Sequence, residues 1–121
     1  MENLIQVNDQ LSSTDLFEAF KNQLAKDFEQ SNFESDFIKA LEPDYSAIHK
    51  NIVQVLQRSE KRADANLMQL LYRIDISETQ LKRYVNESKN ENHLITIAEL
   101  IIKRVLQKVV IKKFYKNKEN P

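Results

Sequence analysis

The sequence contains no glycine, although average usage of about 7% would place roughly eight or nine in a chain of 121 residues. Glycine adopts with least strain the backbone conformations of phosphate-binding loops, nucleophile elbows and tight hairpin turns. Its absence therefore argues against the P-loop, dinucleotide-binding and hydrolase classes, and against β-hairpins. It favours helices that are joined by asparagine and serine instead.

Cysteine is also absent, and the chain has no long run of apolar residues. Disulfides, thiolate metal sites and cysteine nucleophiles are therefore excluded, and a reducing compartment suits the chain. The first residues, MENLIQVNDQLSS, lack the basic start and apolar run of a secretory signal. No segment approaches the ~18 consecutive apolar residues that a membrane span needs. We therefore expect a cytoplasmic protein with no membrane span.

Apolar residues recur at helical spacing from residue 14 to residue 41. Residues 14–30, TDLFEAFKNQLAKDFEQ, form one such pattern and predict a helix of about four turns. Ser31 and Glu34 then have the spacing of a capping box, and the apolar phase restarts there. We therefore expect a second helix from this point, which Pro43 would end.

Two further lines of apolar residues run through residues 44–74 and stay nearly in phase with each other. A single helix of about thirty residues would exceed the usual length, so we favour a break near Ser59, while one continuous helix stays open. Ser77 begins a second capping-box pattern and predicts another helix start. The last helix is expected to begin at Asn92 or His93.

These segments predict an all-α fold, a single compact bundle of five or six amphipathic helices over residues 1–121. Each predicted helix has one apolar stripe, which its neighbours must cover. Residues 1–12 are expected to form either a short helix or a loose arm. Residues 116–121 are expected to be a frayed tail.

The stretch IIKRVLQKVVIKKFYKNK, residues 101–118, combines apolar and basic side chains without a single acid. Four of its cations recur every four residues, so a continuous helix would align them along one side. We call this set the basic ridge: Arg104, Lys108, Lys112 and Lys116. The simplest interpretation is a core helix whose basic side faces water.

Whether this helix continues past Val110 stays open at the level of sequence. The three β-branched residues 109–111 weaken the helix prediction there. A helix that does continue would bring apolar residues onto a second side, where a partner can bind. These residues are Leu100, Ile111 and Phe114.

The charges are segregated along the chain, although they cancel in total. Residues 1–60 carry eleven acidic and five basic side chains, a net charge of −6, whereas residues 61–121 carry seven and thirteen, a net charge of +6. Such polarity can attract an acidic partner, a phosphate backbone or a second copy of the chain. The neutral total and the sequence pI of 6.7 argue against a dedicated nucleic-acid binder.

Residues suited to catalysis or metal binding are sparse. His49 and His93 lie far apart, and neither has a metal-like spacing to other ligands. No Glu-x-x-His pair and no calcium-loop pattern occurs. We therefore predict no catalytic residue, no cofactor and no metal ligand.

The dense apolar stretch LMQLLYRIDIS, residues 67–77, contains a candidate pair of interface anchors, Tyr72 and Arg73. Tyrosine and arginine are both common at binding hot spots. The alternative is an ordinary bundle helix in which Tyr72 extends its hydroxyl toward water.

The sequence thus predicts a small non-catalytic module that binds another protein or a second copy of itself. The basic ridge would supply the charged contacts to a complementary acidic or apolar groove. Two alternatives stay open. One is a nucleic-acid-associated regulator that uses the same ridge, and the other is a small helical enzyme with carboxylates gathered in the bundle core.

Overall fold

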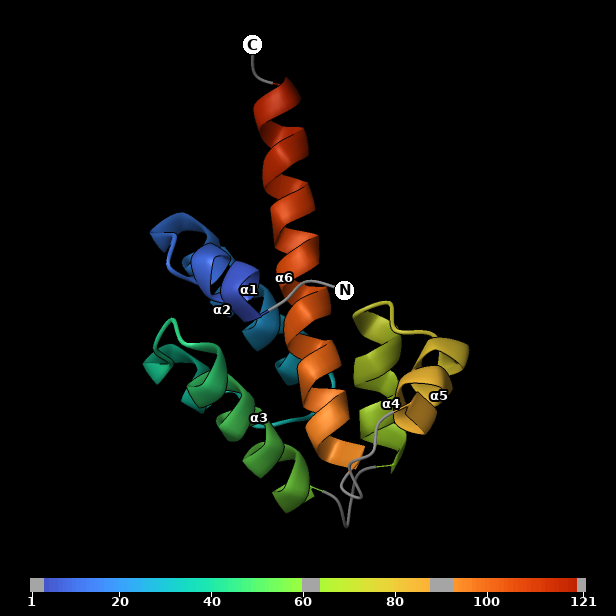
Figure 1. Cartoon of the computed structure of the whole chain (residues 1–121). Coiled ribbons are helices and arrows are strands. Elements are labelled where there is room, and N and C mark those ends of the chain that lie inside the picture. The colour runs from blue at the N-terminus through green and yellow to red at the C-terminus, as the bar shows by residue number, and fades with distance from the viewer. Residues whose placement is uncertain (1–3, 60–63, 88–92, 120–121) are drawn as a thin grey trace.

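The computed structural model of the chain describes residues 4–59, 64–87 and 93–119. Within these ranges the protein is all-α and has no strand, which confirms the predicted fold class. Six α-helices and one short 3-10 helix pack into a bundle (Figure 1). In chain order they are α1 (Leu4–Leu11), α2 (Thr14–Gln30), η1 (Asp36–Ala40), α3 (Tyr45–Ser59), α4 (Asp64–Arg73), α5 (Glu78–Glu87) and α6 (His93–Glu119).

Helix α6 forms the axis of the bundle and, at 27 residues, is the longest of the described helices. Figure 1 shows α1 and α3 on one side of it, α4 and α5 on the other, and α2 crossing behind. Its apolar face is buried between Thr96 and Val109, because neighbouring helices cover it there. At 1.5 Å per residue the helix is about 40 Å long. Its last turns therefore extend past the other helices (Figure 1).

A single cluster of buried apolar side chains connects the helices. Phe20 and Phe28 of α2 and Ile101 and Ile102 of α6 are among its largest fully buried members. Burial of one such side chain contributes about 2 to 3 kcal/mol relative to exposure. The packing of α2 against α6 is therefore strongly determined, and it positions the surface between them.

Residues 4–11 form helix α1, so the short helix and not the loose arm is present in the described part of this segment. Val7 and Leu11 are buried in the core. The side-chain oxygen of Asn8 accepts a hydrogen bond of 3.1 Å from the backbone N–H of Tyr45. Helix α1 is thus held both by apolar packing and by the first residue of α3.

Helix α2 ends in a turn that is usually formed with glycine. Asn32 has a left-handed backbone with φ of 64°, and asparagine tolerates this region better than most residues. The N–H of Asn32 donates to the carbonyl of Glu29 at 3.2 Å, and the N–H of Phe33 donates to that of Phe28 at 2.9 Å. The two phenylalanine rings pack with centroids 5.7 Å apart. This is a Schellman motif with its accompanying apolar contact.

The same turn shows that the helix predicted from Ser31 is wrong. Ser31 caps the C-terminus of α2, and its buried hydroxyl has no hydrogen-bond partner in the described part of the chain. Glu34 pairs instead with Arg58 at 3.3 Å. The left-handed residue reverses the chain, so only the five residues of η1 become helical. The apolar spacing that predicted a helix is explained by an irregular segment, whose buried residues include Phe33, Ile38 and Leu41.

Helix α4 ends in the same way, with Asp75 in the left-handed region at φ of 62°. The N–H of Asp75 donates to the carbonyl of Tyr72 at 3.1 Å, and that of Ile76 donates to the carbonyl of Leu71 at 2.9 Å. The turn leads into α5, where the Ser77 hydroxyl accepts a hydrogen bond from the N–H of Gln80 at 3.0 Å, as the second capping-box pattern predicts. A glycine-free chain thus uses asparagine and aspartate for its sharp helix ends.

Two questions that the sequence left open have answers in the structure. The described parts of residues 44–74 hold two helices, α3 up to Ser59 and α4 from Asp64, and residues 60–63 between them lie outside the described part of the chain. The last helix begins at His93 and continues past Val110 as far as Glu119, so residues 116–119 belong to it. Residues 120 and 121 lie outside the described part of the chain. Within the described part, none of the helices has the length and apolar character needed to span a membrane.

Candidate functional site

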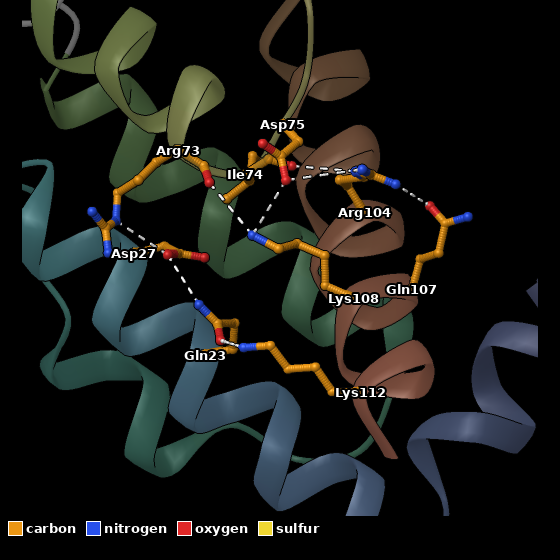
Figure 2. A network of polar contacts seen from close by, with 9 residues as sticks. All are labelled: Gln23, Asp27, Arg73, Ile74, Asp75, Arg104, Gln107, Lys108 and Lys112. Carbon is orange, nitrogen blue, oxygen red and sulfur yellow. Dashed lines mark hydrogen bonds and ion pairs between the residues drawn. The ribbon is translucent and has the colours of Figure 1, made fainter. Parts of the chain in front are cut away.

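The inner half of the basic ridge turns toward the C-terminus of α4 (Figure 2). The guanidinium Nε of Arg104 donates to the carbonyl of Ile74 at 3.3 Å, and Nζ of Lys108 donates to the carbonyl of Arg73 at 3.4 Å. Both cations also lie near the Asp75 carboxylate, at 4.0 and 3.7 Å. The last carbonyls of a helix lack partners within it and carry the negative end of its dipole. Two of the predicted partner-binding cations thus hold α4 against α6.

Next to them lies a buried ion pair between α4 and α2. The side chain of Asp27 is only 2% exposed, and its Oδ1 lies 3.2 Å from Nε of Arg73. The same oxygen accepts a hydrogen bond of 3.1 Å from Nε2 of Gln23. The other carboxylate oxygen, Oδ2, has no hydrogen-bond partner among the described residues. Arg73 is therefore committed to a contact within the protein, because its removal would leave a buried charge without a cation.

The two residues of the proposed anchor pair, Tyr72 and Arg73, therefore have different surroundings. Arg73 points to α2, whereas Tyr72 is 85% exposed. Adjacent residues of a helix point about 100° apart, so one can be buried while the next faces water. Tyr72 and Met68, which is 47% exposed, border a hollow between α4 and α5. The residues that line it are Met68, Gln69, Leu71, Tyr72, Ile76, Ser77, Glu78 and Leu81.

The outer half of the ridge has different surroundings, because the described contacts of Lys112 and of the adjacent Lys113 are with α2. Nζ of Lys112 donates to Oε1 of Gln23 at 3.2 Å, which Figure 2 shows as the last link of the polar network. Lys113 lies 3.5 Å from the Asp15 carboxylate at the start of α2. Both lysines remain partly exposed to water.

These lysines border a groove between α2 and α6 with a volume of about 550 Å³. We call it the lysine groove. It is lined by Asp15, Ala19, Asn22, Gln23, Lys26, Val109, Lys112 and Lys113. Ala19 and Val109 supply an apolar floor, and three lysines against one aspartate give the lining a formal charge of +2. Lys26 and Lys112 are the two lysines of the lining without an ion pair in the described structure.

The predicted second apolar face is only partly available. Leu100 is 6% exposed and packs in the core, so it is closed to a partner. Ile111 is 43% exposed. For Phe114 and Lys116 the structure describes the helical backbone alone.

On the α3 side of α6, His49 and Tyr45 form a small aromatic cluster. Their rings stack at 5.6 Å, and Nε2 of His49 lies 2.8 Å from the carbonyl oxygen of Ile95. Burial, with a smaller contribution from the Glu99 carboxylate, raises the pKa of Tyr45 well above its ordinary value. A hydrogen bond to a backbone carbonyl orients a histidine for packing between helices. In the described residues, no group of three or more histidine, aspartate or glutamate side chains could hold a metal ion.

Sequence reasoning missed most of the lysine groove. Its α2 side, represented by Asp15, Asn22 and Lys26, is visible in the sequence only as an ordinary polar stripe at helical spacing. Its two walls come from residues almost ninety positions apart, such as Gln23 and Lys112. No pattern within one helix indicates such a pairing.

Comparison of the chain with protein-family models, with curated proteins and with solved structures finds no match. The function is therefore inferred from the chemistry of these surfaces.

Proposed function

We propose that the protein is a non-catalytic, cytoplasmic interaction module whose lysine groove binds an acidic segment of a protein partner. The observation that supports this proposal most directly is the composition of the groove. It combines a small apolar floor, formed by Ala19 and Val109, with lysines at its border. Because the chain has no net charge, its overall composition does not explain the cluster of lysines around this groove.

The two parts of the groove would act differently in binding. The apolar floor contributes through burial, which is the dominant favourable term in most protein association. The lysines attract an acidic partner over a distance and align it, which raises the association rate more than the final affinity. An amphipathic acidic helix has both features and fits a groove between two helices.

The extension of α6 adds to this basic surface. Residues 114–119, which follow the groove lining in sequence, carry two lysines and one glutamate. Their helical backbone extends past the bundle (Figure 1), next to the Lys113 end of the groove. A bound partner can therefore meet positive charge both in the groove and along the last turns of α6.

Nucleic acid is the other ligand that lysines attract. The apolar lining residues Ala19 and Val109 favour protein, because a phosphate backbone has no apolar groups to place against them. The chain as a whole also lacks the positive charge of a dedicated nucleic-acid binder.

The test measures fluorescence anisotropy of a synthetic amphipathic helix with glutamate on one face and leucine on the other. We expect the Lys26→Glu/Lys112→Glu variant to bind it at least about tenfold more weakly than the wild type, a loss of about 1.4 kcal/mol. The matched control is Lys50→Glu/Arg83→Glu, which reverses two exposed charges outside the groove. It should bind within about twofold of the wild type, because its effect is limited to screened long-range charge.

A single-stranded oligonucleotide serves as the second probe. Preferential binding of the oligonucleotide, with a log–log salt slope near one unit per contacted phosphate, would contradict the proposal and assign the groove to nucleic acid. Equal weakening by the groove variant and the control would show that only net charge matters. That outcome would also contradict the proposal.

A further inference from the structure

The surface of the protein has an acidic region as well as a basic one. The segment of residues 34–44, which contains η1, carries four exposed carboxylates opposed by one lysine, Lys39. We call it the acidic segment; its carboxylates are Glu34, Asp36, Glu42 and Asp44. Glu34 pairs with Arg58, and Asp44 accepts a hydrogen bond from the first turn of α3. Among the described residues, Asp36 and Glu42 take part in no ion pair.

The acidic segment and the lysine groove lie on different sides of α2. The η1 segment packs against α2 through Phe37, whose ring centroid is 5.8 Å from that of Phe28. Lys26, in the groove, precedes Phe28 by two residues, which is about 200° around a helix. One copy of the chain therefore cannot bring its own acidic segment into its own groove.

We propose that the lysine groove of one copy binds the acidic segment of a second copy, so that the chains associate head to tail. This inference rests on the proposed function, because it names the partner that fills the groove. The two unpaired carboxylates of the segment meet the two unpaired lysines of the groove. The equal and opposite charges of the two halves of the chain, −6 and +6, match this arrangement, since each copy supplies the charge that the next one needs.

A contact between two different surfaces leaves one groove and one acidic segment free at the ends of each assembly. Further copies can then add, unless the rotation between copies closes a ring. Exposed ion pairs contribute little individually and are screened by salt. The association is therefore weak, depends on protein concentration and weakens as salt increases.

The experiment measures the mass-average molar mass of the full chain by light scattering at increasing protein concentration. At an ionic strength of about 0.01 M, where the Debye length is about 30 Å, we expect the mass to rise above the 14.3 kDa of one chain. At about 0.15 M, where that length is about 8 Å, the mass should fall back toward one chain.

Two charge-reversal variants identify the surfaces involved. The groove variant is Lys26→Glu/Lys112→Glu, and the segment variant is Asp36→Lys/Glu42→Lys. Each should remain a monomer alone. Mixed together, they should associate again, because the groove of each variant is then complementary in charge to the segment of the other.

A variant with all four substitutions keeps a net charge of zero and exchanges the signs of the two surfaces. We expect this variant to associate again. Because its net charge equals that of the wild type, a change in net charge cannot explain that result. Circular dichroism of each variant verifies that the helices are intact.

A wild type that stays monomeric at both ionic strengths would overturn the inference. Association that neither variant removes, or a mixture that stays monomeric, would also overturn it. If the wild type is monomeric but its groove binds the acidic helix probe, the inference fails alone and the proposed function stands. If the groove binds neither the probe nor a second copy, both fail.

Discussion

The cations of the basic ridge are spaced alike along α6, yet its inner and outer members have different surroundings. Arg104 and Lys108 donate to backbone carbonyls at the end of α4 and lie near Asp75. Among the described residues, the polar contact of Lys112 is with the Gln23 side chain, at the border of an open groove. The difference arises because α4 covers one part of α6 and leaves the next part free. Cations with the same spacing therefore stabilise the fold in the inner half of the ridge, whereas those in the outer half are available for binding.

The largest expected effect tests the network beside the inner cations. Arg73→Ala should lower the free energy of unfolding by about 3 kcal/mol, because it leaves the Asp27 carboxylate buried without its cation. Denaturant titration with linear extrapolation measures this change. The neighbouring substitution Tyr72→Ala is the control and should change stability by no more than about 0.5 kcal/mol, since Tyr72 is exposed. Similar values for the two variants would contradict the structural role of Arg73.

Paired substitutions test whether the inner and outer halves of the ridge differ in their contribution to stability. Arg104→Ala/Lys108→Ala should destabilise the protein by about 2 kcal/mol, because charged hydrogen bonds and helix-end contacts are lost. Lys112→Ala/Lys113→Ala should cost no more than about 0.5 kcal/mol, because its contacts are exposed. The outer pair should instead reduce binding of the acidic probe. Equal losses of stability would show that the two halves of the ridge do not differ.

The smallest effects concern the two left-handed helix ends. Asn32→Gly should raise stability by about 0.5 to 1 kcal/mol, since glycine adopts the left-handed backbone without the steric cost of a side chain. Asp75→Gly should leave stability within about 0.5 kcal/mol of the wild type. It gains the same relief but removes the carboxylate next to the inner cations, Arg104 and Lys108. Thermal unfolding of both variants under one condition compares them, and an equal gain at both sites would mean that this carboxylate contributes nothing.

In the segment of residues 31–43 the helix prediction is wrong, which shows that apolar spacing alone does not determine the backbone conformation. The apolar residues between Ser31 and Pro43 have helical spacing, yet most of that segment is irregular. A single residue, Asn32, decides the outcome by adopting a left-handed backbone that ends α2. The apolar side chains are still buried, because an irregular chain can also cover a neighbouring helix, as the packing of Phe33 on Phe28 shows. Spacing therefore predicted burial correctly and local conformation incorrectly.

The sequence by itself determined the helical class of the protein and the helix of residues 14–30, and it favoured a break near Ser59 and a start of the last helix at Asn92 or His93. These features depend on interactions between residues a few positions apart, and on the absence of glycine. Only the tertiary structure decided which cations of the ridge serve the fold and which border a groove. That outcome depends on which helices lie against α6, and it joins residues as distant as Gln23 and Lys112. Long-range packing follows from the burial of the whole apolar surface, which no local pattern contains.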